Sequence, residues 1–236
     1  MNLQINLENV LFLDIETVPA FPGFADLDER FSKLWKHKAD LIRKTETDTP
    51  ETLWPRAGIY AEFGKVICIS VGIMKGNLFR MKSFAGRDEK TVLEEFSGLL
   101  KSLDGKREII LCAHNGKEFD FPYLSRRMLI NRMPLPKPLD ISGKKPWEIP
   151  HLDTMDLWKF GDYKNYTSLD LLSAVFNIDT PKDDIDGSQV GQVFYQENDL
   201  ERIKAYCQKD TLTVAQILLS ILGKSLILPE NVVIVE

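Results

Sequence analysis

Apolar residues recur along this chain at the spacing of a strand in some segments and at the spacing of a helix in others. These two spacings predict where strands and helices lie. A largely apolar, partly β-branched run over residues 10–18 predicts a strand that ends at Pro19. Apolar runs at 64–74 and 78–84, joined by Lys75-Gly76-Asn77, predict a hairpin that adds to this strand in the antiparallel part of a mixed sheet. A further buried strand is expected at residues 108–113.

Helical spacing of apolar residues follows in the second half of the chain and between the strands. Thr167 with Asp170, and Asn198 with Glu201, are spaced as capping pairs that begin helices. The expected helices cover residues 88–103, 119–131, 167–176, 188–198 and 198–222. The chain has 236 residues, of which 44% are hydrophobic, so it can bury one sizeable core. We therefore expect one elaborated α/β domain.

Three segments lie outside this alternation. Residues 20–62 form a long insertion after the first strand, with a charged helix at 27–44 and aromatic residues that favour a packed lid over disorder. Residues 133–150 are rich in proline and predict a stiff loop, either flanking a single strand or serving as a plain connector. The tail, about 224–236, adds a short strand or stays partly loose. The insertion's aromatic residues are Phe21, Phe24, Phe31 and Trp35, and its cations, which suit phosphate contacts or a solvated helix face equally, are Lys33, Lys36, Lys38, Arg43 and Lys44.

Composition narrows the class of protein. The net charge of -5 speaks against a protein that coats duplex nucleic acid, but not against an enzyme that processes its ends. Cys68, Cys112 and Cys207 form no C-x-x-C pair, so buried, reduced thiols are expected rather than a zinc site or disulfides. The sequence shows no run of transmembrane length and no signal-peptide layout, which predicts a cytoplasmic protein that does not engage membranes.

The first strand carries the first candidate chemistry. Asp14 and Glu16 are two residues apart, so they share one face of the strand, while Leu11, Leu13 and Ile15 face the other way. The strand contains no Lys or Arg to neutralise its two acids, and a hard cation such as Mg²⁺ or Mn²⁺ favours oxygen ligands of this kind. The alternative is an edge strand whose acids face water.

Two further short motifs carry acids on helices. Asp120 follows the turn His114-Asn115-Gly116 and falls in the first turn of a helix, a position where the helix dipole favours any acid. Tyr206 and Asp210 are four residues apart, so they lie on one face of the last long helix. Taken singly, each motif fits an ordinary structural role as well as a ligand.

In combination, the three motifs resemble those of the DnaQ-like 3′–5′ exonucleases of the DEDD type. The D-x-E motif falls at Asp14 and Glu16, the N-x-x-x-F-D motif at Asn115, Phe119 and Asp120, and the Y-x-x-x-D motif at Tyr206 and Asp210. Ala205 stands where the histidine variant would have its histidine, so the chain resembles the tyrosine (DEDDy) type, similar to the exonuclease domain of family B DNA polymerases. The resemblance covers roughly residues 8–222 and includes the stretch 151–157.

This resemblance implies a ribonuclease H-like fold: a mixed β-sheet flanked by helices, in a single 3′–5′ exonuclease domain over residues 1–236 with the insertion at about 20–62. It implies two divalent cations, Mg²⁺ or Mn²⁺, that clamp the attacking and leaving oxygens. Tyr206 would orient the attacking water, because a phenol with a pKa near 10 is a poor base at neutral pH. The implied metal ligands are Asp14, Glu16, Asp120 and Asp210, and the implied substrate-binding residues are Thr17, Phe119 and Asn115, of which Asn115 better suits support of the turn.

The expected substrate is the 3′ end of single-stranded DNA or RNA, with DNA favoured and nucleoside monophosphates released. No polymerase palm fits in the chain, so a role in proofreading or DNA repair would need a polymerase or repair partner in trans. One alternative is a haloacid-dehalogenase-like phosphatase with Asp14 as nucleophile, for which Lys182-Asp183-Asp184 is the nearest approximation to the required downstream site. The other is a catalytically silent nucleic-acid-binding module. The presence of an acid at every expected ligand position argues against it.

Overall fold

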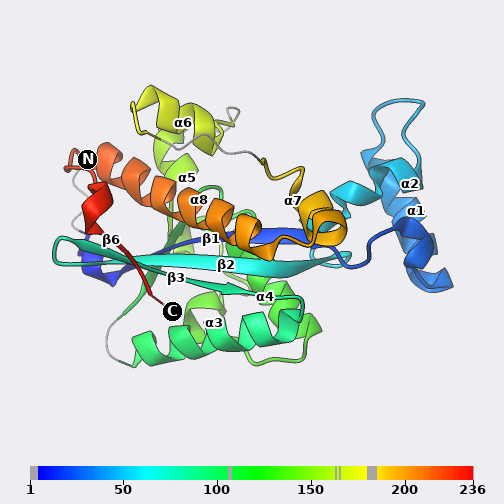
Figure 1. The fold of residues 1–236 in the computed structure, drawn as a ribbon, viewed down its shortest axis with the longest axis horizontal. Coiled ribbons are helices and arrows are strands. Elements are labelled where there is room, and N and C mark those ends of the chain that lie inside the picture. Colours follow the sequence, from blue (N-terminus) through cyan, green and yellow to red (C-terminus); the bar gives the residue numbers. More distant parts are fainter. Residues whose placement is uncertain (1–4, 106–107, 163, 165, 180–184, 236) are drawn as a thin grey trace.

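A six-stranded mixed sheet organises the chain. The computed structural model describes residues 5–105, 108–162, 164, 166–179 and 185–235, and Figure 1 shows the fold. The strands occur in the order β5-β4-β1-β2-β3-β6 across the sheet. Their bounds are β1 Val10–Pro19, β2 Gly64–Lys75, β3 Leu78–Ala85, β4 Ile110–Ala113, β5 Leu152–Asp153 and β6 Val232–Ile234.

Strand directions confirm the expected mixed sheet. The strands β1, β2 and β3 pair in antiparallel fashion, with β2 and β3 forming the predicted hairpin. On the other side of β1, β4 and β5 run parallel to it. The strand expected at 108–113 is shorter than predicted, since β4 begins at Ile110. The tail contributes β6, which pairs in parallel with β3 at the far edge.

Side chains along β1 alternate between the two faces of the sheet, and each face packs against different helices. Leu11 and Leu13 pack in a core with Phe96 of α3, Glu89–Asp104, and Leu124 of α4, Asp120–Ile130. Phe12 points the other way and packs with residues of α8, Leu200–Ile221. Figure 1 shows α8 on one face and α3 with α4 on the other. Three shorter helices lie on the α8 side: α5 Thr154–Lys159, α6 Leu169–Val175 and α7 Val190–Gln192.

Both predicted capping pairs are wrong, each by one residue. Asp199, not Asn198, caps α8, and its carboxylate accepts a hydrogen bond from the Arg202 backbone N–H at 3.0 Å. Asn198 instead has a left-handed backbone, with φ of 59°, and ends a π-helical turn, η6 Val193–Glu197. The helix expected at 188–198 is therefore the short α7 followed by this turn. Ser168, not Thr167, caps α6 by accepting from the Leu171 N–H at 3.2 Å.

The insertion at 20–62 folds around a small core of its own. It comprises η2 Phe24–Asp26, α1 Glu29–Ile42, α2 Pro50–Leu53 and η3 Trp54–Ile59, where η2 and η3 are 3₁₀ turns. Trp35 is fully buried, its ring centroid lies 5.2 Å from that of Trp54, and its indole N–H donates to the Pro50 carbonyl at 2.7 Å. The prediction of packing rather than disorder is confirmed, although Phe21 and Phe31 stay 44% and 41% exposed.

The remaining regular elements are short 3₁₀ turns. Two of them, η4 and η5, lie in the proline-rich stretch at 133–150. Among the residues that the structure describes, no helix is both long enough and apolar enough to cross a membrane. The bounds of these turns are η1 Leu7–Asn9, η4 Lys137–Leu139, η5 Pro146–Glu148 and η7 Pro229–Asn231.

Candidate active site

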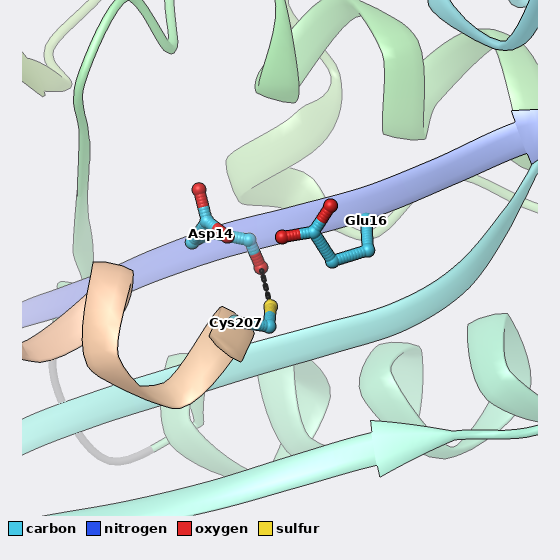
Figure 2. A group of neighbouring side chains, drawn as sticks. All are labelled: Asp14, Glu16 and Cys207. Atoms are coloured by element: carbon cyan, nitrogen blue, oxygen red, sulfur yellow. Dashed lines mark hydrogen bonds between the residues drawn. The ribbon is translucent and has the colours of Figure 1, made fainter. Parts of the chain in front are cut away.

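The two acids of β1 lie on the face of the sheet that α8 covers. Asp14 is paired with Ser70 and Glu16 with Cys68 in the neighbouring strand β2, and the register shifts immediately after Glu16. Such an irregularity bends a strand and re-aims its side chains. Figure 2 shows the Glu16 carboxylate extending toward Asp14, with Cys207 of α8 beside both. The predicted shared face of Asp14 and Glu16 is confirmed.

Asp120 reaches β1 because β4 ends early. β4 pairs with β1 only over Val10–Phe12, which leaves the edge of β1 open beyond that point. The first turn of α4 lies there, and the Asp120 carboxylate accepts a hydrogen bond from the backbone N–H of Ile15, the residue between the two β1 acids. Asp120 is only 4% exposed. The helix start predicted for Asp120 is thus correct, and it brings the acid to the β1 pair.

The turn from β4 into α4 is held by a buried carboxylate. Asp153, 2% exposed, accepts hydrogen bonds from the backbone N–H groups of Asn115 and Lys117, each at 3.0 Å, and it also caps α5. Asn115 has a left-handed backbone, with φ of 61°. A Cβ at Gly116 would lie 2.5 Å from the Cβ of Ala113, so only glycine fits this close approach. Asn115 therefore shapes the turn, as expected for it.

The helix α8 supplies the third motif. The Cys207 thiol donates a hydrogen bond to the Asp14 backbone carbonyl at 3.4 Å, which fixes α8 against β1 at this level. Tyr206 precedes this contact, and its hydroxyl hydrogen-bonds to Asp210 one helical turn further on. Tyr206 and Asp210 thereby share one face of α8, as the spacing predicts.

The charges of Asp120 and Asp210 act on the two acids of β1. Burial raises the pKa of Asp14 well above its usual range, and the nearby charges of Asp210 and Asp120 raise it further. Burial and the charges of Asp14, Asp210 and Asp120 raise the pKa of Glu16 in the same way. Burial is the largest of the causes that raise the pKa of Asp120 to about 8. Acids from three distant parts of the chain therefore form one repelling cluster.

The cluster suits a hard divalent cation. Ligand atoms of Asp14, Glu16 and Cys207 all lie within 4.8 Å of one another. The Oδ2 atom of Asp14 is buried without a hydrogen-bond partner, which costs free energy that a bound cation would offset. Burial raises the pKa of the Cys207 thiol, which already donates to a carbonyl, so Cys207 is a protonated neighbour and the carboxylate oxygens are the candidate donors.

Beside Glu16 lies a cavity of about 440 Å³. Glu16, Thr17 and Phe119 line it together, so three of the predicted site residues meet there, whereas Asn115 is not part of its wall. The opposite wall comes from the insertion and the segment before α7. The other residues that line the cavity are Ile15, Pro19, Pro55, Arg56, Gly58, Ile59, Gly187, Ser188 and Gly191.

Sequence reasoning missed three residues of this region. Asp153 enters the sequence analysis only within the stretch 151–157, although an Asp directly before Thr154 is a capping signal. Cys207 is the buried, free thiol that the sequence predicts, but no pattern indicates its contact with the Asp14 carbonyl. The sequence analysis names the insertion's cations between residues 33 and 44 rather than Arg56, but the described lining of the cavity includes none of them; Lys38, for example, lies over the Tyr60 ring at 4.1 Å. The pattern Pro55-Arg56-Ala57-Gly58, where the insertion returns to the sheet, could have indicated it.

A six-stranded mixed sheet with helices on both faces, whose strand β1 carries Asp14 and Glu16, has the ribonuclease H-like architecture. Residues 59–221 match a family described as predicted 3′–5′ exonucleases related to the exonuclease domain of PolB, and the chain belongs to this family. The match begins beyond β1, so Asp14 and Glu16 lie outside it.

A solved structure shows the same fold. The family B DNA polymerase from the hyperthermophilic archaeon Pyrobaculum calidifontis resembles this chain with a TM-score of 0.52 and 19% sequence identity. The similarity covers 89% of this chain but only 24% of the polymerase, so the chain spans about a quarter of that protein. A search of curated proteins found no match. At this identity the likeness establishes the fold, and the expectation of a ribonuclease H-like mixed sheet is confirmed.

Proposed function

We propose that this chain is a metal-dependent 3′–5′ exonuclease that removes nucleoside monophosphates from single-stranded DNA. The observation that carries this proposal is the convergence of Asp14, Glu16, Asp120 and Asp210 next to a cavity. Family membership supports the reaction class. In this proposal two cations, Mg²⁺ or Mn²⁺, are held by the same four acids: Asp14, Glu16, Asp120 and Asp210.

Those cations, when bound, neutralise the acids, lower the pKa of water and stabilise the charge of the leaving oxygen. The protein's own contribution is to position groups. The backbone N–H of Ile15 orients Asp120, and the Cys207 contact locates α8 and with it Asp210.

Tyr206 positions the attacking water. Burial, together with the charges of Asp210 and Glu16, raises the pKa of the Tyr206 hydroxyl, so the phenol stays protonated at neutral pH. A protonated phenol cannot act as a base, but it can donate and accept hydrogen bonds. We therefore assign Tyr206 an orienting role, with Asp210 holding its hydroxyl in place.

The cavity suits a strand end. It lies against Glu16 and has a volume of about 440 Å³, within the usual range for pockets that bind small ligands, about 300–1,000 Å³. Phe119 offers a ring on which a base can stack, and stacking of this kind is indifferent to sequence. Thr17 and Phe119 are accordingly the substrate-binding residues of this proposal, whereas Asn115 supports the turn.

The two alternative functions, a phosphatase and a silent binding module, would require other features of the site. A haloacid-dehalogenase-like phosphatase would need a lysine and paired acids from another loop, and Lys182-Asp183-Asp184 lies outside the described residues. A silent binding module would have no need to bury repelling carboxylates. The acid cluster therefore favours the exonuclease. By analogy with the polymerase, the partner that supplies the strand end would be a polymerase or repair protein acting in trans.

The decisive assay uses 5′-labelled single-stranded DNA and RNA with Mg²⁺, Mn²⁺ or EDTA. We expect a ladder that shortens from the 3′ end by one nucleotide at a time, only with metal, and faster on DNA. The control substrate is a covalently closed DNA circle of the same sequence, which should resist. Cleavage of the circle as fast as its linear form would show that the enzyme is no exonuclease, and release of phosphate from p-nitrophenyl phosphate without strand shortening would favour a phosphatase.

A further inference from the structure

The far wall of the cavity beside Glu16 comes from η3 of the insertion. The Trp54 indole N–H donates to the Phe21 carbonyl at 3.0 Å, and the Tyr123 hydroxyl of α4 donates to the Gly58 carbonyl at 2.6 Å. A Cβ at Gly58 would lie 2.9 Å from the Val18 carbonyl carbon, so η3 packs directly on the backbone of β1. The residues between Trp54 and Gly58 are therefore fixed relative to Glu16.

Arg56 lies in this fixed segment and lines the cavity. It is exposed, and it forms no ion pair and no hydrogen bond with any described residue. Among the described residues that line the cavity, Arg56 is the single cation and Glu16 the single acid. A guanidinium without an internal partner, held on a rigid turn over a cavity, is available to a ligand of opposite charge.

The rest of the cavity determines which anion fits. Ile15, Pro19, Pro55 and Ile59 provide apolar surface, and Phe119 provides a ring. Such a wall suits the base and sugar of a nucleotide, and the guanidinium matches the oxygens of a phosphate, which it can bind through two parallel hydrogen bonds.

We propose that Arg56 is a substrate-binding residue supplied by the insertion, and that its guanidinium holds a backbone phosphate of the strand end in the cavity beside Glu16. The inference rests on the proposed function, because it takes the ligand of the cavity to be a nucleic-acid end. It also gives the insertion a role in substrate binding, since Arg56 belongs to η3 of the insertion and lies outside residues 59–221, which match the family.

The test compares Arg56→Ala with wild type on a 5′-fluorescein-labelled oligothymidylate. Because the phosphate contact is made in the ground state and in the transition state alike, KM should rise about 10- to 100-fold while kcat stays within about threefold. Loss of one phosphate contact should also make the slope of log KM against log salt less steep by about 0.7. Arg56→Lys should keep the wild-type slope.

Arg30→Ala is the matched control, since it removes the same charge from an exposed position on α1 that does not line the cavity. If Arg56→Ala gives the same KM and salt slope as Arg30→Ala in an active enzyme, the inference is wrong and the proposed function stands. If wild type releases no nucleotide, the proposed function fails, and fluorescence anisotropy of the same oligonucleotide in EDTA still decides the inference. Binding that is equal in wild type and Arg56→Ala, or absent in both, overturns it.

Discussion

Burial of acids without a compensating cation destabilises a protein, and Asp14, Glu16 and Asp120 each carry this cost. None of these three acids forms an ion pair among the residues that the structure describes, and burial raises the pKa of all three. Their neighbours are arranged to keep them there: Ile15 donates its N–H to Asp120, and Cys207 holds the Asp14 backbone. The proposed cations would offset the cost of burying these acids.

The first prediction concerns these ligands. Asp14→Ala, Asp120→Ala and Asp210→Ala should each fold and each abolish turnover, because each removes one oxygen donor from a shared site. The double variants should be scarcely worse than the singles, since residues that act as a unit lose most function at the first change. Isothermal calorimetry should show weakened Mn²⁺ binding in every single variant; undiminished binding in all three would contradict the assignment.

Tyr206→Phe separates orientation of water from metal binding. The change removes one hydroxyl and keeps the ring, so the packing of α8 should survive. Loss of the orienting hydrogen bond should lower kcat by about 10²- to 10³-fold, or roughly 3–4 kcal/mol. Mn²⁺ affinity and KM should stay near wild type. The comparison is Asp210→Asn, which should lose both turnover and metal affinity; full activity of Tyr206→Phe would leave the hydroxyl with a packing role only.

The raised carboxyl pKa values predict how stability depends on pH in the absence of metal. The pKa of Asp120 is about 8 in the folded protein and about 3.9 in an unfolded chain. Between these values the folded state binds more protons, so stability is fully present below about pH 4 and is lost as the pH rises through 8. In EDTA, the Tm should therefore fall between pH 5.5 and pH 8. Asp120→Asn removes this titration and should flatten the fall; an equally steep fall in that variant would refute the attribution to Asp120.

At the scale of elements, local periodicity predicted most of the fold. The alternation along β1 assigned Asp14 and Glu16 to one face, and helical spacing placed Asp120 at the start of α4. Cap residues were missed by one position because Asn198 and Asp199 are both good caps in isolation. The structure uses Asp199, since Asn198 is needed with a left-handed backbone to end η6. Competition of this kind depends on how the preceding turn packs, which spacing does not encode.

The convergence of the three motifs was predicted only through a resemblance. No periodicity brings β1, α4 and α8 together, because their approach depends on where β4 ends and how α8 packs on the sheet. The role of Asp153 was missed for the same reason. Its bonds reach Asn115 and Lys117, almost forty residues away.

Asp153→Ala tests whether this contact positions Asp120. The change leaves the backbone N–H groups of Asn115 and Lys117 without their acceptor, which should cost about 1–3 kcal/mol of unfolding free energy. Because the turn leads into α4, kcat should fall as well. Urea denaturation and initial rates measure the two effects. The matched control is Asp156→Ala, one turn away, whose partly exposed carboxylate makes ion pairs with Lys117 and Lys159 and should matter little. Equal effects of the two variants would remove the special role of Asp153.

For the molecule as a whole, the insertion is a second small core attached to the end of the sheet. Figure 1 shows α1 and α2 beyond the end of β1, away from α3 and α8. Its aromatic content predicted packing, and Trp35 with Trp54 confirms it. The sequence did not indicate that η3 would contact the backbone of β1 and line the cavity, because that contact depends on Gly58 and on Tyr123 from α4. Of the insertion's described elements, η3 is the one that lines the cavity, so η3 connects the insertion to the site.

Trp35→Ala should therefore loosen the insertion and leave the sheet intact. Trp35 is fully buried between Trp54 and Phe63, and truncating a residue of this size costs about 3–5 kcal/mol. Hydrogen exchange should accelerate in residues 24–60 and stay unchanged in β2 and β3, because the two cores are separate clusters.

Loosening of η3 would also release Arg56, so KM for the oligonucleotide should rise as it does in Arg56→Ala. Leu34→Ala is the control, since Leu34 neighbours Trp35 on α1 but is 48% exposed. It should change neither exchange nor KM. If Trp35→Ala instead speeds exchange equally in β2 and in the insertion, the two cores unfold as one unit. In that case the insertion could not adjust substrate binding independently of the catalytic acids.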